Sequence, residues 1–201
     1  AGVERNDVVF VGGYHLEKVV QFYPGLRFYF DENWQEEDKR GSLQLVESLL
    51  QGPCFLCDSN IVFRSPTLDD LANNGYDIAV GSKDSEPLCD RHPHNSLIVY
   101  LSEAGAAAMR QSLRNGMEDQ YQKLSHWLFS LASHQVTVGT IDVSAASALL
   151  RDSGSLARFV LGNKGQTLER LKPVLSRARV LEQVRFSVVD WYKSPEEILT
   201  R

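Results

Sequence analysis

The chain has 201 residues, 43% of them hydrophobic, which is enough to bury one sizeable core. Its 21 Lys and Arg stand against 26 Asp and Glu, a formal net charge of −5, so we expect no nucleic acid partner. No apolar run is long enough to span a membrane and the three cysteines cannot all pair within the chain, so we expect a cytoplasmic protein with no membrane partner.

Short apolar runs alternate with amphipathic stretches through the first eighty residues. The pattern predicts strands at 7–11, 26–30, 54–57 and 77–80, helices at 15–23 and 42–50, and a helix start at 67–70. Ser42 is the expected N-cap of the second helix, and the acidic loop 31–38 before it is expected to be solvated. This alternation predicts an α/β fold with a parallel sheet.

The rest of the chain continues the alternation, with strands predicted at 97–101 and 136–143 and helices at 103–113, where Ser102 is the cap, and 117–132. Shorter helices near 156–161 and 168–176 and strands near 180 and 186–189 follow. Net charge changes from −9 over residues 1–150 to +4 over 151–201, which suggests a boundary near 150. Five aromatic residues are expected in the core: Phe22, Tyr23, Phe28, Phe30 and Trp127.

A series of motifs over approximately residues 1–160 resembles the sugar-phosphate and phosphocholine-type nucleotidyltransferases. The motifs, in order, are Val9 to Lys18, Tyr23-Pro24, Asn33-Trp34, Gly41 to Leu43 and Asp58 to Phe63. The resemblance implies a Rossmann-like, open, mostly parallel sheet. It also implies that the first βα unit, with the family's phosphate-cradling loop, is lacking.

This resemblance implies that Gly13, Ser42, Asp58 and Asn60 contact a nucleotide. Ligands of open α/β sheets bind beyond the carboxyl ends of strands, where Gly13, the 31–41 loop and Asp58 are expected to gather. By the same resemblance Asp58 is a ligand of Mg²⁺, with Asp152 as a weaker second candidate. The implied reaction transfers a nucleoside monophosphate from an NTP, with CTP as the first candidate, to a small phosphorylated or phosphonate acceptor.

A second likeness covers Ser155 to Leu171, Ala178 to Leu181 and Phe186 to Trp191. It resembles the junction at which such a domain is fused to a phosphoenolpyruvate synthase-like ATP-grasp domain. We therefore expect a nucleotidyltransferase-like domain at 1–154, and a linker with the beginning of the fused domain at 155–201. Both ends of the chain are expected to be cuts through a longer polypeptide.

Five positions depart from the family pattern. Asn60 stands where relatives have a metal-binding Asp, and the late motif that supplies the second metal carboxylate in relatives is replaced by Ser147, Leu149, Arg151 and Ser155. An amide oxygen is a neutral and weaker ligand for a hard cation than a carboxylate. The alternative function is therefore a catalytically degenerate binding or structural module fused to the ATP-grasp domain.

Overall fold

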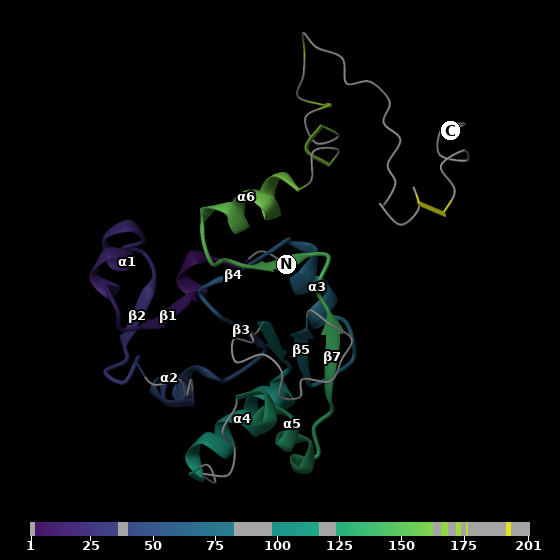
Figure 1. Cartoon of the computed structure of the whole chain (residues 1–201). Helices are drawn as coiled ribbons and strands as arrows, with labels where there is room; N and C mark the ends of the chain where they lie inside the picture. Colours follow the sequence, from purple (N-terminus) through teal and green to yellow (C-terminus); the bar gives the residue numbers. More distant parts are fainter. Residues whose placement is uncertain are drawn as a thin grey trace. The chain divides into compact units, whose positions relative to one another are not determined.

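The computed structural model describes residues 3–35, 40–82, 98–116 and 124–162, together with 166–168, 172–173, 176 and 192–193 (Figure 1). The chain divides into two compact units, Ala1–Leu149 and Leu150–Arg201. The assignment of functional domains to 1–154 and 155–201 stays a prediction. None of the described helices is long and apolar enough to cross a membrane.

The first unit contains three groups of strands. They are the pair β1 (Val9–Gly12) and β2 (Arg27–Phe30), the pair β4 (Ile61–Phe63) and β8 (Ser147–Leu149), and a sheet of β3 (Cys54–Cys57), β6 (Ile98–Leu101), β5 (Ile78–Ser82) and β7 (Val138–Asp142) in that order. The helices of this unit are α1 (Leu16–Phe22), α2 (Arg40–Leu45), α3 (Pro66–Ala72), α4 (Glu103–Arg114) and α5 (Leu124–Ser130), with short 3-10 turns η1 (Arg5–Asp7), η2 (Glu47–Leu49) and η3 (Leu131–His134).

Three of the four strands in the larger sheet run in the same direction. β6 is antiparallel to both β3 and β5, and β7 is parallel to β5. β3, β5 and β7 therefore have their carboxyl ends at one edge of the sheet. β1 and β2 are also parallel to each other. These directions and the intervening helices confirm the expected α/β, Rossmann-like class with parallel sheet segments, although three of the five described strand pairings, β3 with β6, β4 with β8 and β5 with β6, are antiparallel.

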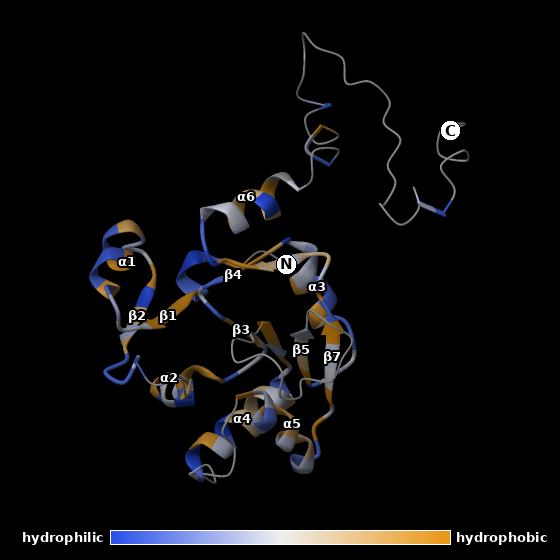
Figure 2. Ribbon diagram, viewed as in Figure 1, coloured by the Kyte–Doolittle hydropathy of each residue, from blue (hydrophilic) through white to orange (hydrophobic). Residues whose placement is uncertain are grey.

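Hydrophobic side chains cover both faces of the larger sheet. On β5, Ile78 and Val80 belong to the cluster that includes Met109 of α4 and Trp127 of α5, whereas Ala79 belongs to a second cluster with Leu71 of α3. Successive side chains of a strand point to opposite faces, so this division places α4 and α5 on one face and α3 on the other. Figures 1 and 2 show these helices flanking the apolar strands.

The sequence located the helix starts with mixed success. Ser102 caps α4 as predicted, because its Oγ accepts a hydrogen bond from the Gly105 N–H at 3.1 Å. At α3, however, Ser65 is the N-cap and Pro66 occupies the first turn, so the predicted start at Thr67 is wrong by two residues. Thr67 is instead a buried side chain. Proline fits the first turn because that N–H has no intrahelical partner.

The aromatic residues around β1 and β2 do not lie where the sequence placed them. Trp127 is buried as expected, but Phe22, Tyr23 and Phe30 are exposed, Phe22 by 77%. Among the described strands β1 and β2 pair only with each other, and helix α1 buries none of its residues. Within the described part of the chain, β1, β2 and α1 therefore offer these rings no buried position.

The second unit begins with α6 (Ser153–Leu161), which confirms a helix in the region predicted near 156–161. Most of residues 163–201 lie outside the described residues, including the strands predicted near 180 and 186–189. The likeness to an ATP-grasp junction falls largely on these residues.

Candidate functional site

Asp31 directly follows β2 and is only 6% exposed. Its Oδ1 accepts a hydrogen bond from the backbone N–H of Asn33 at 2.9 Å, and its Oδ2 accepts one from the hydroxyl of Ser42. Its own N–H donates to the carbonyl oxygen of Gly12 at 3.0 Å. The first residue of the loop expected to be solvated is therefore buried, because three hydrogen bonds tie it to β1, to its own loop and to α2.

Gly13, at the end of β1, lies against the same loop. A Cβ atom at this position would overlap the Trp34 ring and lie 2.6 Å from the backbone oxygen of Asp31. No side chain fits there unless the loop moves, so glycine is required by the close approach. The structure thus brings the predicted residues Gly13 and Ser42 together, with Asp31 joining them.

Ser42 has a different local role from the one predicted. Helix α2 begins at Arg40, which places Ser42 inside the first turn and not at the N-cap. Its hydroxyl donates to Asp31 from that position. The predicted capping role is therefore wrong. The reason is tertiary, since the hydroxyl bonds a buried carboxylate eleven residues earlier in the chain.

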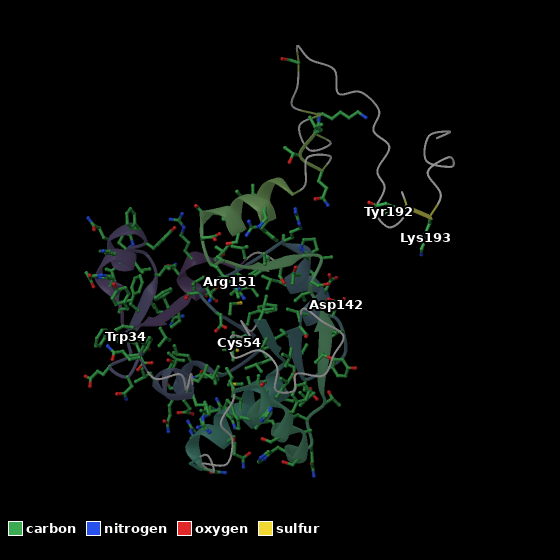
Figure 3. All side chains as sticks on the ribbon, in the orientation of Figure 1. Trp34, Cys54, Asp142, Arg151, Tyr192 and Lys193 are labelled. Atoms are coloured by element: carbon green, nitrogen blue, oxygen red, sulfur yellow. The ribbon has the colours of Figure 1, made fainter. Side chains whose placement is uncertain are left out.

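Three aromatic rings follow one another at the ends of β1 and β2. The ring centroid of Tyr14 lies 4.2 Å from that of His15 and 5.1 Å from that of Trp34. Tyr14 is 67% exposed and Trp34 is 40% exposed. His15 adopts the left-handed backbone conformation with φ of 49°, and its Nδ1 lies 2.9 Å from Glu17 Oε1. Figure 3 shows Trp34 beyond the end of β2, away from Cys54 in the central strands.

Asp58 and Asn60 lie in the turn between β3 and β4, where the Ile61 N–H donates to the Asp58 carbonyl oxygen at 3.1 Å. Asp58 is half-buried and Asn60 is exposed. The expectation that Asp58 gathers with Gly13 required one continuous sheet. Among the described strands, β1 and β3 belong to different sheets, so Asp58 and Gly13 do not share a sheet edge, and their gathering around one ligand stays a prediction.

The carboxyl edge of the larger sheet carries polar residues at three strand ends. Ser82 pairs in register with Asp142 at the ends of β5 and β7, and Asp58 directly follows β3 at the same edge. Asp142 Oδ1 accepts the Ser144 N–H at 2.8 Å. That hydrogen bond holds the pKa of Asp142 below its ordinary value, so the group stays ionised at neutral pH.

Asp152 belongs to the second unit, where it is the N-cap of α6. Its Oδ1 accepts the Ser155 N–H at 2.6 Å, and the Ser155 hydroxyl oxygen accepts the Asp152 N–H at 3.1 Å. These bonds to Ser155 lower the pKa of Asp152. The local geometry accounts for this carboxylate as half of a capping box.

The described residues offer few ligands for a metal ion. No three His, Cys, Asp or Glu side chains gather within this part of the chain. At the end of β3 the donors are the Asp58 carboxylate and the Asn60 amide. Mg²⁺ is commonly held by one or two carboxylates together with water and substrate phosphates. This donor set fits Mg²⁺ only when a bound nucleotide supplies further oxygens.

Comparison of the fold with solved structures finds similar chains. One is a protein assigned as a glucose-1-phosphate thymidylyltransferase from Bacillus anthracis, solved in complex with sucrose. The TM-score is 0.52 at 12% sequence identity, over 78% of this chain and 76% of that one. The chain therefore has a fold similar to that of this solved protein. By sequence, it matches no protein-family model and no curated protein.

Three residues at these strand ends were not among the predicted site residues. Asp31 and Trp34 lie in the loop expected to be solvated, although Trp34 also belongs to the Asn33-Trp34 motif, and Tyr14 lies within the Val9 to Lys18 motif but was given no role of its own. A usable signal existed for Asp31, because an Asp at a strand end commonly accepts a hydrogen bond from the backbone N–H two residues later. No local signal exists for the contact between Tyr14 and Trp34, which lie twenty residues apart in the chain.

Proposed function

We propose that this chain is the nucleotide-binding part of a nucleotidyltransferase that transfers a nucleoside monophosphate from an NTP to a small phosphorylated acceptor. The observation that carries the proposal is the fold, which is similar over most of its length to a thymidylyltransferase. The loops at strand ends, where such sheets bind ligands, support it. CTP and a phosphorylated or phosphonate acceptor are the substrates we propose to test first.

In this reaction a phosphate oxygen of the acceptor attacks the α-phosphorus of the NTP, and pyrophosphate leaves. Asp58, together with phosphate oxygens of the nucleotide, would hold Mg²⁺, which supplies charge neutralisation at the reacting phosphates. Gly13, Ser42 and Asn60 are proposed as nucleotide contacts. Gly13 and Ser42 are supported by their common attachment to Asp31, which fixes the loops at the ends of β1 and β2.

The test is calorimetric titration of the protein with each NTP, in the presence and absence of Mg²⁺. We expect binding of at least one NTP that strengthens with Mg²⁺, and we expect Asp58→Ala to remove the strengthening. Asp70→Ala, which changes an exposed carboxylate on α3, is the control and should behave like the unaltered protein. Equal metal-dependent binding by Asp58→Ala would refute the metal assignment. Absence of binding for every NTP would refute the function.

A second candidate function is a binding module without catalysis. The observation in its favour is that Asn60, a neutral and weaker ligand, stands where the resembled family has a metal-binding Asp, and that Leu149 and Ser155 stand where its further carboxylates are expected. The fused phosphoenolpyruvate synthase-like ATP-grasp domain belongs to this proposal. Under it, an NTP would bind but would not be consumed when an acceptor is added. Release of pyrophosphate in a coupled assay therefore separates the two candidates.

A further inference from the structure

Tyr14 and Trp34 are large aromatic side chains that contact their neighbours but remain exposed at the surface. Their ring centroids lie 5.1 Å apart, although the residues belong to loops that follow different strands. Trp34 lies against the bare backbone of Gly13 and is still 40% exposed. Exposed aromatic clusters on a fixed framework are more typical of binding surfaces than of a core.

The position of these rings is set by neighbouring backbone. Asp31, three residues before Trp34, is buried and hydrogen-bonded to β1, to Asn33 and to Ser42. On the other loop, His15 holds a left-handed conformation, which is uncommon for a residue with a Cβ atom, and its ring packs against that of Tyr14 at an interplanar angle of 56°. Such conformations persist only where the surrounding structure enforces them. The backbone that carries the two rings is thus held in place by its neighbours.

The charges around the rings select the kind of group that can lie on them. The described loop segments 13–15 and 31–35 contain two carboxylates, Asp31 and Glu32, and no Lys or Arg. Glu17 stands one residue into α1, beside His15. Lys18 follows Glu17 in the same helix, but within the two described loop segments no Lys or Arg attracts a polyphosphate, whereas an uncharged, flat, aromatic group would be stabilised by the ring faces.

We propose that Tyr14 and Trp34 form a stacking platform for the nucleobase of the bound nucleotide. This inference rests on the proposed function for its choice of ligand. It places the base at the ends of β1 and β2, with the phosphates directed away from the acidic loop. Trp34 and Tyr14 would therefore contribute to affinity for the base, and their removal should weaken binding of uncharged nucleosides as well as of NTPs.

The experiment titrates the full chain with adenosine, guanosine, cytidine, uridine and thymidine without Mg²⁺, and follows the indole N–H resonance of Trp34 by NMR. That resonance is assigned as the one lost in Trp34→Phe. Ribose serves as the ligand that lacks a base, and tetramethylammonium as a cation that lacks a flat ring. We expect at least one nucleoside to shift the resonance, and neither ribose nor tetramethylammonium to do so.

Variants then test the two rings, with binding measured by ligand-observed NMR so that Trp34 itself is not needed. Trp34→Ala and Tyr14→Ala should each weaken nucleoside binding about fivefold or more. Trp34→Phe, which retains a ring, should bind more tightly than Trp34→Ala. Phe22→Ala removes an exposed ring at the far end of α1 and should bind nucleosides like the unaltered chain.

Unchanged nucleoside binding in Trp34→Ala would overturn the platform, as would a response to tetramethylammonium alone or no nucleoside binding at all. These results are distinct from failure of the proposed function. If nucleosides bind through Trp34 but no NTP is turned over, the stacking platform is supported and the transfer reaction is refuted. If NTPs bind with Mg²⁺ through Asp58 but Trp34→Ala has no effect on binding, only the stacking platform is refuted.

Discussion

At the scale of single residues, Gly13 and Asp31 fix one loop from two sides. Asp31 does so with hydrogen bonds, and Gly13 does so by lacking a side chain where the loop crosses it. Neither residue belongs to a regular sequence pattern. Both matter because parts of the chain that are distant in sequence meet at their positions.

Gly13→Ala should therefore destabilise the protein. The added Cβ atom would overlap the Trp34 ring and press on the backbone oxygen of Asp31, so the loop must shift, at a cost of about 1–3 kcal/mol. The measurement is the free energy of unfolding from urea denaturation. The control is Gly25→Ala, where no atom lies within 4 Å of the added Cβ, and it should change stability by less than about 0.5 kcal/mol. Equal stabilities for the two variants would contradict this account of the close approach.

At the scale of secondary-structure elements, Asp77 joins the starts of two strands and a helix. Its Oδ2 accepts hydrogen bonds from the N–H and the hydroxyl of Thr137 at 2.9 and 2.8 Å, just before β7. Its Oδ1 accepts the hydroxyl of Ser102, the cap of α4, at 2.9 Å. The bonds from Thr137, followed by the one from Ser102, lower the pKa of Asp77 below its ordinary value of 3.8.

Because the folded state lowers this pKa, the ionised Asp77 stabilises the fold above pH 4, and the contribution is lost as pH falls through the folded-state value. Asp77→Asn should reduce the free energy of unfolding at pH 7 by about 1 kcal/mol, since the amide cannot accept all three bonds. The difference between variant and unaltered protein should shrink as the pH is lowered below 4.

Urea denaturation at several pH values checks this prediction. The matched control is Asp142→Asn, at the other end of β7. There an amide oxygen can still accept the local bond from Ser144, so a smaller loss is expected. A stability difference for Asp77→Asn that stays constant from pH 7 to pH 3 would show that the effect is not due to the ionised carboxylate.

At the scale of the whole molecule, the first unit contains its own core. All buried hydrophobic side chains of the described residues lie between Val46 and Val143, within Ala1–Leu149. A chain ending at Leu149 should therefore fold by itself. Its thermal unfolding, followed by circular dichroism, should be cooperative, and its free energy of unfolding should lie within about 1 kcal/mol of that of the full chain. Loss of cooperative unfolding in the shortened chain would contradict this prediction.

The sequence was sufficient for the elements whose signals are local. Hydrophobic runs located β1, β3, β5 and β6, and Ser102 located the start of α4, because period, burial and capping chemistry act within a few residues. β4 and β8 were missed, since three-residue strands are too short to show a period and they pair with each other across more than eighty residues. The strands and helices that the sequence did locate were enough to predict the α/β class.

Only part of the candidate site could be predicted from local sequence patterns. The sequence selected Gly13 and Ser42 through a family resemblance, but it could not show that buried Asp31 joins them or that Tyr14 meets Trp34. Nor could it show that β1 and β3 belong to separate described sheets, which places Asp58 in a different turn. Local patterns determine which segments become strands and helices. Contacts between distant segments depend on packing and strand order, and only the tertiary structure decided them.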